Sequence, residues 1–160
     1  MQANGNEDRM LTYFGYGTLL GEGHMKHQYP SARLLGMGFC KGYELGFWCY
    51  ADPSDGGCAI VEKPDGILFG MLYELSQEDM DRLLVVGGHA DWYQALTVDV
   101  TSVAGGSVRA LTLRVAGFRG GWAPPPDYAA LVIDGAREAG LPAEYQQRLA
   151  DIVDRARAGA

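Results

Sequence analysis

The sequence predicts an α+β fold, a small mixed β-sheet that curls into a barrel and carries flanking helices. Short segments rich in β-branched and aromatic residues recur up to residue 115, and apolar residues at helical spacing follow them. The expected strands are Leu11–Tyr16, Tyr43–Trp48, Cys58–Val61, Ile67–Leu75, Tyr93–Val100 and Val108–Val115.

Turn-forming residues separate these strands. Gly105-Gly106 lies between the last two strands and predicts a hairpin. Residues 52–57 and Pro64-Asp65-Gly66 also predict turns, because glycine, proline and aspartate favour chain reversal. Residues 96–100 alternate between apolar and polar side chains, which predicts a strand with one buried face.

One helix is expected between strands and two more after the last strand. Ser76 is a suitable N-cap for the first, with Asp79 as an approximate capping box. Pro124–Pro126 opens the second helix, and Leu141-Pro142 separates it from the third. The residues expected to face inward are Met80, Leu83 and Leu84, then Tyr128, Leu131 and Val132, and finally Tyr145, Leu149, Ile152 and Val153.

Length and composition favour a cytoplasmic protein, with a flexible tail over 1–10 and a single domain over 11–156. A net charge of −7 disfavours nucleic acid and anionic membranes as partners. No apolar run is long enough to span a bilayer, and the first nine residues lack the apolar segment of a secretory signal. We therefore expect a monomer or homodimer whose partner is a small molecule.

Cysteine and histidine spacing predicts no disulfide framework, no metal and no cofactor. Cys40, Cys49 and Cys58 form an odd set without C-x-x-C spacing, which favours a reducing compartment. His24 and His27 share a helical spacing, but no further ligand stands at a recognisable separation. Cys58 follows two glycines and is a candidate nucleophile, although no Cys-His signature accompanies it.

A strand that stops abruptly at glycine is the most informative feature for function. It is Tyr13-Phe14-Gly15-Tyr16-Gly17-Thr18-Leu19-Leu20. Gly15 and Gly17 would permit backbone angles that other residues avoid and let a ligand approach the main chain. The N–H groups that follow would form a nest for an oxyanion or a carboxylate. Nucleotide-binding spacing is absent, because Leu20 stands where the dinucleotide fingerprint has its third glycine.

Several motifs follow one another along the chain in a recognisable order. The turn Tyr16-Gly17-Thr18-Leu19-Leu20 is similar to Tyr-Gly-Ser-Asn-Leu, and residues 29–36 are similar to Cys-Pro-x-Ala-x-Leu-x-Gly. Residues 70–75 match a Gly-Val-Leu-Tyr-x-Leu strand, and residues 135–145 match a pair of closing helices. Together these motifs resemble the γ-glutamylcyclotransferase-like (AIG2-like) family over roughly residues 11 to 150. The resemblance implies a small mixed β-barrel with flanking helices.

The resemblance also implies a glutamate after the mid-chain helix that acts as general base. It would take a proton from the substrate's α-ammonium, so that the amine attacks its own γ-carbonyl and closes 5-oxoproline. That glutamate precedes a family tyrosine that corresponds to Tyr93, so Gly87 occupies its position here. Thr18 keeps the hydroxyl of the signature serine, whereas Leu19 lacks the amide of the asparagine.

Two residues of the same loop are candidate replacements for the base. His89 titrates near neutral pH, and Asp91 would restore a carboxylate, although both residues also suit a solvated loop. Glu44 and Glu74 lie in expected strands, where we expect them to face outward. Trp92 is a candidate pocket wall for the ligand. The resemblance implies that Tyr93 lines the same cavity.

Three functions are compatible with these residues. The first is a divergent γ-glutamylcyclotransferase-like enzyme that acts on a small metabolite by altered chemistry. Its binding turn would comprise Tyr16, Gly17, Thr18, Leu19 and Leu20. The second is γ-glutamyl cyclisation with His89 or Asp91 as the base. The third is a non-catalytic binding or accessory protein, for which ligand binding without turnover would be diagnostic.

Overall fold

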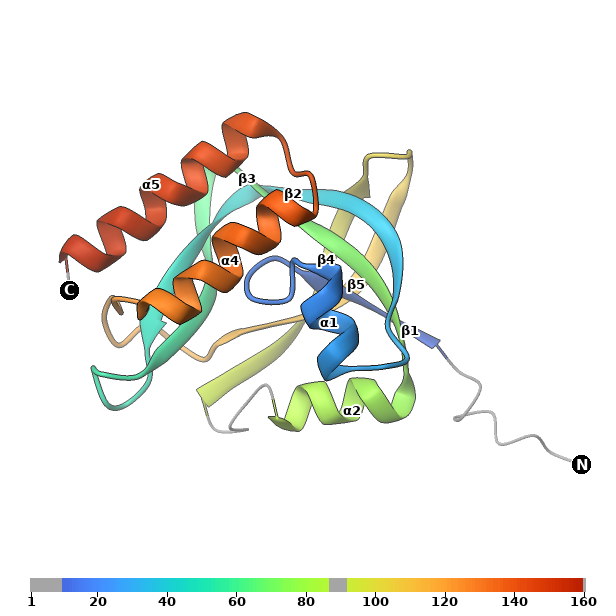
Figure 1. Ribbon diagram of the computed structural model, residues 1–160, viewed down its shortest axis with the longest axis horizontal. Helices are drawn as coiled ribbons and strands as arrows, with labels where there is room; N and C mark the ends of the chain where they lie inside the picture. Colours follow the sequence, from blue (N-terminus) through green and yellow to red (C-terminus); the bar gives the residue numbers. More distant parts are fainter. Residues whose placement is uncertain (1–9, 87–91, 160) are drawn as a thin grey trace, which may run out of the picture.

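A closed five-stranded barrel forms the body of the protein in this computed structural model, which describes residues 10–86 and 92–159 (Figure 1). The strands are β1 (Met10–Gly15), β2 (Arg33–Cys49), β3 (Gly56–Ser76), β4 (Tyr93–Ser102) and β5 (Ser107–Val115). Their order around the barrel is β1-β3-β2-β4-β5. Neighbouring strands are antiparallel, except that β1 meets β5 in parallel at Tyr13 and Leu111. The predicted α+β barrel is confirmed.

Two strands are longer than the sequence predicts. β2 begins at Arg33 rather than at Tyr43, and β3 joins two expected strands into one. The prediction of a turn at Pro64-Asp65-Gly66 is wrong, because the chain continues along β3 without reversing. The pairing of β2 with β3 instead changes register between Lys41 and Tyr43, so residues 63–66 form a bulge in which 63–65 are exposed and Gly66 is buried.

The hairpin expected at Gly105-Gly106 is confirmed. These glycines connect β4 to β5, and their φ values are 115° and 83°. Glycine adopts such positive angles without the steric cost that a side chain would add. The alternation within β4 is also confirmed, since Val98 and Val100 are buried while Asp99 is exposed.

Helices α1 (Glu22–Gln28), α2 (Gln77–Val86), α4 (Pro126–Glu138) and α5 (Ala143–Gly159) lie outside the barrel (Figure 1). The sequence predicts α2, α4 and α5, but α1 is not among the expected elements. Leu131 was expected to face inward, which is wrong, because α4 buries Ala129, Val132 and Ala136 and leaves Leu131 36% exposed. No described helix is both long and apolar enough to cross a membrane.

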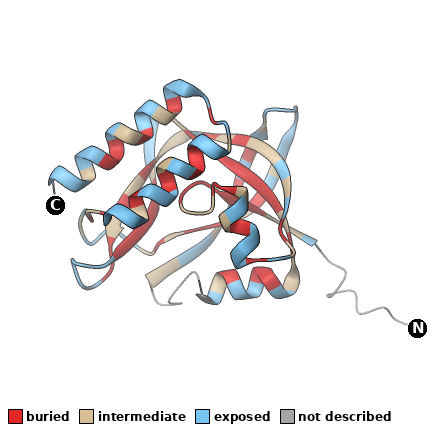
Figure 2. Cartoon of the chain, viewed as in Figure 1, coloured by how far each residue is buried: buried red, intermediate tan, exposed pale blue. Residues whose placement is uncertain are grey.

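The hydrophobic core fills the barrel and continues beneath α4 and α5 (Figure 2). Phe14 and Leu68 from the strands are fully buried, as is Leu149 from α5. β1 contributes to this core until its last residue, Gly15, where the chain leaves the sheet. The core thereby fixes the end of β1, from which the candidate site is built.

Candidate functional site

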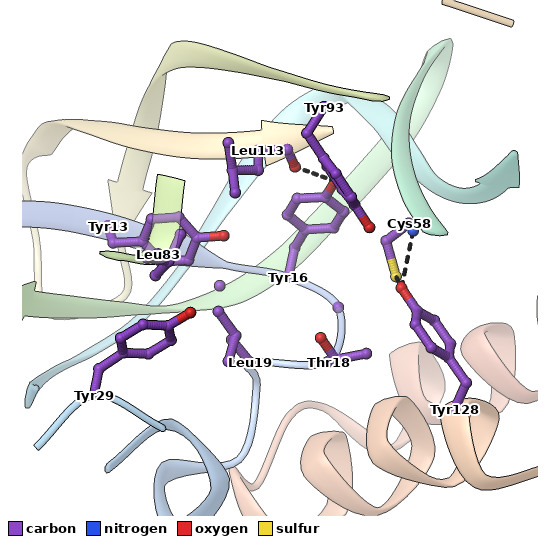
Figure 3. Close-up of a pocket in the computed structure, with 12 residues that line it drawn as sticks. Tyr13, Tyr16, Thr18, Leu19, Tyr29, Cys58, Leu83, Tyr93, Leu113 and Tyr128 are labelled. Atoms are coloured by element: carbon purple, nitrogen blue, oxygen red, sulfur yellow. Dashed lines mark hydrogen bonds between the residues drawn. The ribbon is translucent and has the colours of Figure 1, made fainter. Parts of the chain in front are cut away.

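A pocket of about 80 Å³ lies where the chain leaves β1 and turns through residues 16–20 (Figure 3). Segments that are distant in the sequence converge on it. Its described lining comprises Tyr13, Gly15, Tyr16, Gly17, Thr18, Leu19, Tyr29, Cys58, Leu83, Tyr93, Leu113 and Tyr128. Every titratable side chain in this lining is a tyrosine or a cysteine, so the described walls offer hydroxyl and thiol groups without a formal charge.

The glycines of the turn provide space. A side chain on Gly15 would lie 2.8 Å from the carbonyl oxygen of Leu19, and one on Gly17 would lie 2.6 Å from the Cys58 sulfur. Neither glycine has a positive φ, so the expectation that they supply unusual backbone angles is wrong. The turn itself is closed by the Leu20 N–H, which donates to the Gly17 carbonyl at 3.3 Å.

Tyr16 fastens the turn to β5. Its hydroxyl donates to the Leu113 carbonyl at 2.6 Å, and the nearby Thr112 hydroxyl donates to the Phe14 carbonyl at 2.7 Å. Burial raises the pKa of Tyr16 well above its ordinary value, so its hydroxyl stays protonated. The hydroxyl proton of Tyr16 is therefore used in a hydrogen bond to the main chain of β5.

Cys58 and Tyr128 form one wall of the pocket. The Tyr128 hydroxyl accepts from the Cys58 N–H at 3.0 Å and donates to the Cys58 sulfur at 3.3 Å (Figure 3). Burial raises the pKa of the Cys58 thiol to about 11, although hydrogen bonds from Tyr128 and from the Thr18 N–H oppose the rise. A thiol with this pKa is protonated at neutral pH, so Cys58 does not meet the requirement for a nucleophile.

Tyr93 completes this wall. Its hydroxyl accepts from the Tyr50 hydroxyl at 3.0 Å. A side chain on Gly57 would collide with the Tyr93 hydroxyl and would also lie 3.1 Å from the Tyr50 hydroxyl. Because Gly57 has no side chain, the hydroxyls of Tyr50 and Tyr93 can both pack against it. Burial raises the pKa of Tyr93, so this hydroxyl is neutral at physiological pH.

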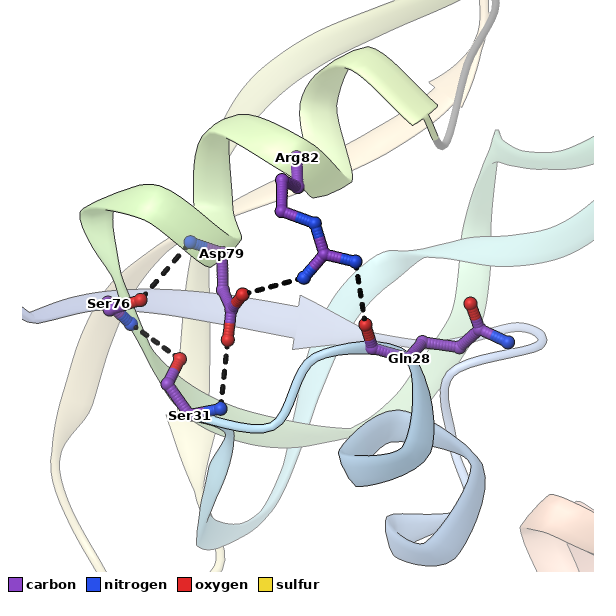
Figure 4. Close-up of polar contacts among 5 residues, drawn as sticks. All are labelled: Gln28, Ser31, Ser76, Asp79 and Arg82. Carbon is purple, nitrogen blue, oxygen red and sulfur yellow. Dashed lines mark hydrogen bonds and ion pairs between the residues drawn. The ribbon is translucent and has the colours of Figure 1, made fainter.

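Tyr29 and Leu83 form the opposite wall of the pocket. The buried carboxylate of Asp79 holds this wall in place. Asp79 is 7% exposed and accepts from the Ser31 N–H at 2.8 Å and from Arg82 Nη1 at 2.9 Å (Figure 4). The Arg82 guanidinium also covers the Tyr29 ring, 5.5 Å from its centroid. Asp79 and Arg82 lie on α2 with Leu83, so these contacts join α2 to the loop that carries Tyr29.

The capping box predicted for α2 is half correct. The Ser76 hydroxyl accepts from the Asp79 N–H at 3.1 Å, as an N-cap does. The Ser76 N–H, however, donates to the Ser31 hydroxyl at 3.0 Å rather than to Asp79. Burial alone would raise the pKa of Asp79, but Ser31 and Arg82 outweigh it and lower that pKa below its ordinary value.

Sequence comparison identifies the family. The sequence pattern of the AIG2-like family matches residues 67–149 of the 160, which is more than half of the chain. This chain belongs to the AIG2-like family. The AIG2-like chain is 25% identical to the γ-glutamylcyclotransferase of Homo sapiens over 152 residues, which cover 91% of this chain and 80% of the human protein. The Bos taurus γ-glutamylcyclotransferase is also 25% identical, over 88% of this chain and 77% of its own length.

Solved structures confirm the fold of this AIG2-like protein. A γ-glutamyl cyclotransferase superimposes with a TM-score of 0.82 at 22% identity, over 89% of this chain and 87% of its own. YkqA from Bacillus subtilis superimposes with a TM-score of 0.76 at 22% identity, over 92% of this chain and 55% of its own. At these identities the likeness shows a shared fold.

The AIG2-like structure gathers most of the predicted binding residues around the pocket. Tyr16, Gly17, Thr18, Leu19 and Tyr93 all line it, while their roles in binding stay predictions. The Leu20 N–H already donates to the Gly17 carbonyl. The N–H groups expected to form an anion nest are therefore not all directed at a ligand.

Other predicted site residues lie elsewhere. Leu20 is fully buried beneath the turn, where its carbonyl accepts from the Tyr73 hydroxyl at 3.1 Å. Trp92 stacks on Tyr50 with ring centroids 6.0 Å apart, and the Arg119 guanidinium lies over the Trp92 ring, 5.4 Å from its centroid. Neither Leu20 nor Trp92 is part of the described lining. The candidate catalytic residues His89 and Asp91 lie outside the described residues, as does Gly87, the glycine predicted to stand at the position of the family glutamate.

The described lining of this site contains no carboxylate and no cluster of metal-ligating side chains. Glu44 and Glu74 lie outside the lining and pair with Lys63 at 3.7 Å and with Arg33 at 2.7 Å. Within residues 10–86 and 92–159, no group of three or more histidine, cysteine, aspartate or glutamate side chains is placed to hold a metal ion.

Sequence reasoning missed several phenols of the pocket. Tyr13 was assigned only to the strand before the glycine turn, Tyr128 to the inward face of a helix, and Tyr29 only to a motif. All three line the cavity. The available signal was the abundance of tyrosine, nine residues in 160, since tyrosine is favoured over phenylalanine where a buried ring needs a polar tip.

Proposed function

We propose that this AIG2-like chain is a divergent enzyme that cyclises γ-glutamyl amides of small amines to 5-oxoproline without a carboxylate base. One observation carries the proposal: the described pocket presents hydroxyl groups and one thiol, and burial keeps the titratable ones protonated. Such walls can hold and polarise an amide, but they cannot remove a proton from an ammonium group at neutral pH.

Sequence similarity supports the reaction class. The human, bovine and mouse relatives are named γ-glutamylcyclotransferases, and their similarity to this chain spans about nine-tenths of it. By the family pattern, Gly87 stands at the position of the general base. A related reaction that does not depend on that carboxylate fits both the similarity and the predicted loss of the glutamate.

Simple energetics support a reaction without that base. The α-amino group of a γ-glutamyl amide lies beside a free α-carboxylate, so its pKa is above the value of about 7.7–8.0 for a peptide N-terminus, and only a small fraction of it, below about a tenth, is neutral at pH 7 without any base. A general base typically contributes about 10²–10⁴-fold, whereas a well-oriented intramolecular nucleophile reaches effective concentrations of about 10⁵–10⁸ M. The substrate's own amine is such a nucleophile, so the pocket has only to orient it toward the γ-carbonyl.

Mass spectrometry of 5-oxoproline released from a panel of γ-glutamyl amines and peptides tests the proposal. We expect release of 5-oxoproline from at least one γ-glutamyl derivative of an uncharged amine. We expect the His89→Ala and Asp91→Asn variants to retain most of this release. Loss of release in either variant, with the protein still folded, would establish a substitute base and contradict the proposed chemistry. Tight binding of a panel member without turnover would instead show a binding protein.

A further inference from the structure

We propose that the hydroxyls of Tyr93 and Tyr128 form the oxyanion hole of this pocket. The inference rests on the proposed cyclisation and specifies which groups stabilise its tetrahedral intermediate. Both phenols line the pocket, and both hydroxyls lie on its Cys58 side (Figure 3).

Each hydroxyl is fixed by a hydrogen bond that it accepts. Tyr128 Oη accepts from the Cys58 N–H at 3.0 Å, and Tyr93 Oη accepts from the Tyr50 hydroxyl at 3.0 Å. A phenol whose oxygen accepts from a protein donor keeps its own proton to donate. The Tyr128 proton now points at the weakly accepting Cys58 sulfur, 3.3 Å away, and a negatively charged oxygen is the stronger acceptor.

Two other donors near the pocket are already used. The Leu20 N–H donates to the Gly17 carbonyl at 3.3 Å. Tyr16 also lies in the pocket, but its hydroxyl donates to the Leu113 carbonyl at 2.6 Å. On the Cys58 side of the pocket, Tyr93 and Tyr128 are phenols whose oxygens are fixed by hydrogen bonds that they accept.

The reaction step assigns these donors a defined task. The neutral α-amine of the γ-glutamyl group forms a C–N bond to the γ-carbonyl carbon, and the carbonyl π electrons move onto oxygen. The Tyr93 and Tyr128 hydroxyls donate hydrogen bonds to that oxyanion. The C=O bond then forms again, the bond to the leaving nitrogen breaks, and the proton lost by the attacking nitrogen goes to the leaving amine.

Kinetics of phenylalanine variants test this assignment. Preorganised oxyanion donors contribute about 10²–10³-fold to kcat each, so Tyr93→Phe and Tyr128→Phe should lower kcat by about that factor with little change in KM. Tyr145→Phe is the matched control, because it removes a buried phenol hydroxyl that lies outside the pocket lining. Thermal melts measured in parallel show that each variant is folded.

A double-mutant cycle separates positioning from general structural damage. Tyr50 acts through Tyr93, so Tyr50→Phe should lower kcat in the wild-type background and have no further effect in the Tyr93→Phe background. Unchanged kcat in both Tyr93→Phe and Tyr128→Phe would overturn the oxyanion hole while leaving the proposed function intact. Absence of 5-oxoproline from the wild-type protein would instead refute the proposed function and this inference together.

Discussion

Gly57→Ala is expected to abolish most of the activity while leaving the protein folded. The added methyl group would overlap the Tyr93 hydroxyl and crowd the Tyr50 hydroxyl, so both phenols would have to move. Tyr93 would then leave the position from which it donates to the substrate. We expect kcat to fall about as far as in Tyr93→Phe, by about 10²-fold or more.

Overpacking at this site should also lower stability. Inserting a methyl group into a packed site typically costs about 1–3 kcal/mol. Urea unfolding monitored by tryptophan fluorescence measures this cost, and 5-oxoproline release measures the activity. Gly121→Ala is the matched control, because a side chain there meets no atom within 4 Å. Wild-type activity in Gly57→Ala would show that Tyr93 need not occupy its observed position.

Asp79→Ala is expected to cause the largest loss of stability among single carboxylate changes in the described structure. The substitution leaves the Ser31 N–H without its acceptor and removes the anion that Arg82 contacts. Hydrogen bonds to a charged group contribute about 1.5–3 kcal/mol, so the free energy of unfolding should fall by about 2–3 kcal/mol. Because the same contacts hold Tyr29 and Leu83, ligand binding should weaken as well.

The pH dependence of stability gives this prediction a second readout. The pKa of Asp79 is lowered in the folded protein, so its contribution is complete above the ordinary value of 3.8 and is lost as the pH falls through the lower folded-state pKa. Wild-type protein should therefore lose stability on acidification more steeply than Asp79→Ala. Asp134→Ala is the control, because its pair with Arg137 is 59% and 69% exposed. Equal effects of the two substitutions on urea unfolding would contradict the assigned role of Asp79.

The sequence predicts the fold better than the lengths of its strands. Apolar periodicity identified α4 and α5, and glycine pairs marked the β4–β5 hairpin, because these signals are local. The long strand β3 was split in two because Pro64-Asp65-Gly66 has the composition of a turn. Tertiary pairing with β2 instead absorbs these residues as a bulge, which local composition does not reveal.

The site was predicted only in part, for a related reason. The turn at 16–20 and Tyr93 could be found from motifs, since each stands in a recognisable local pattern. Tyr29, Cys58 and Tyr128 come together only through the barrel and α4, so their shared pocket depends on long-range packing. The same packing shows that Gly15 and Gly17 supply space rather than unusual angles.

The pH dependence of 5-oxoproline release by a His89→Ala/Asp91→Asn double variant tests the base-free reaction most directly. The α-amine of a γ-glutamyl substrate lies beside a free α-carboxylate, so its pKa is above the value of about 8 for a peptide N-terminus, and kcat/KM should rise with pH up to that higher pKa and then level off. We predict the same profile for the double variant and for the wild-type protein. A wild-type profile that rises instead near pH 4–6.5 (about the pKa of a carboxylate or an imidazole), together with loss of activity in the double variant, would show that such a base drives the reaction.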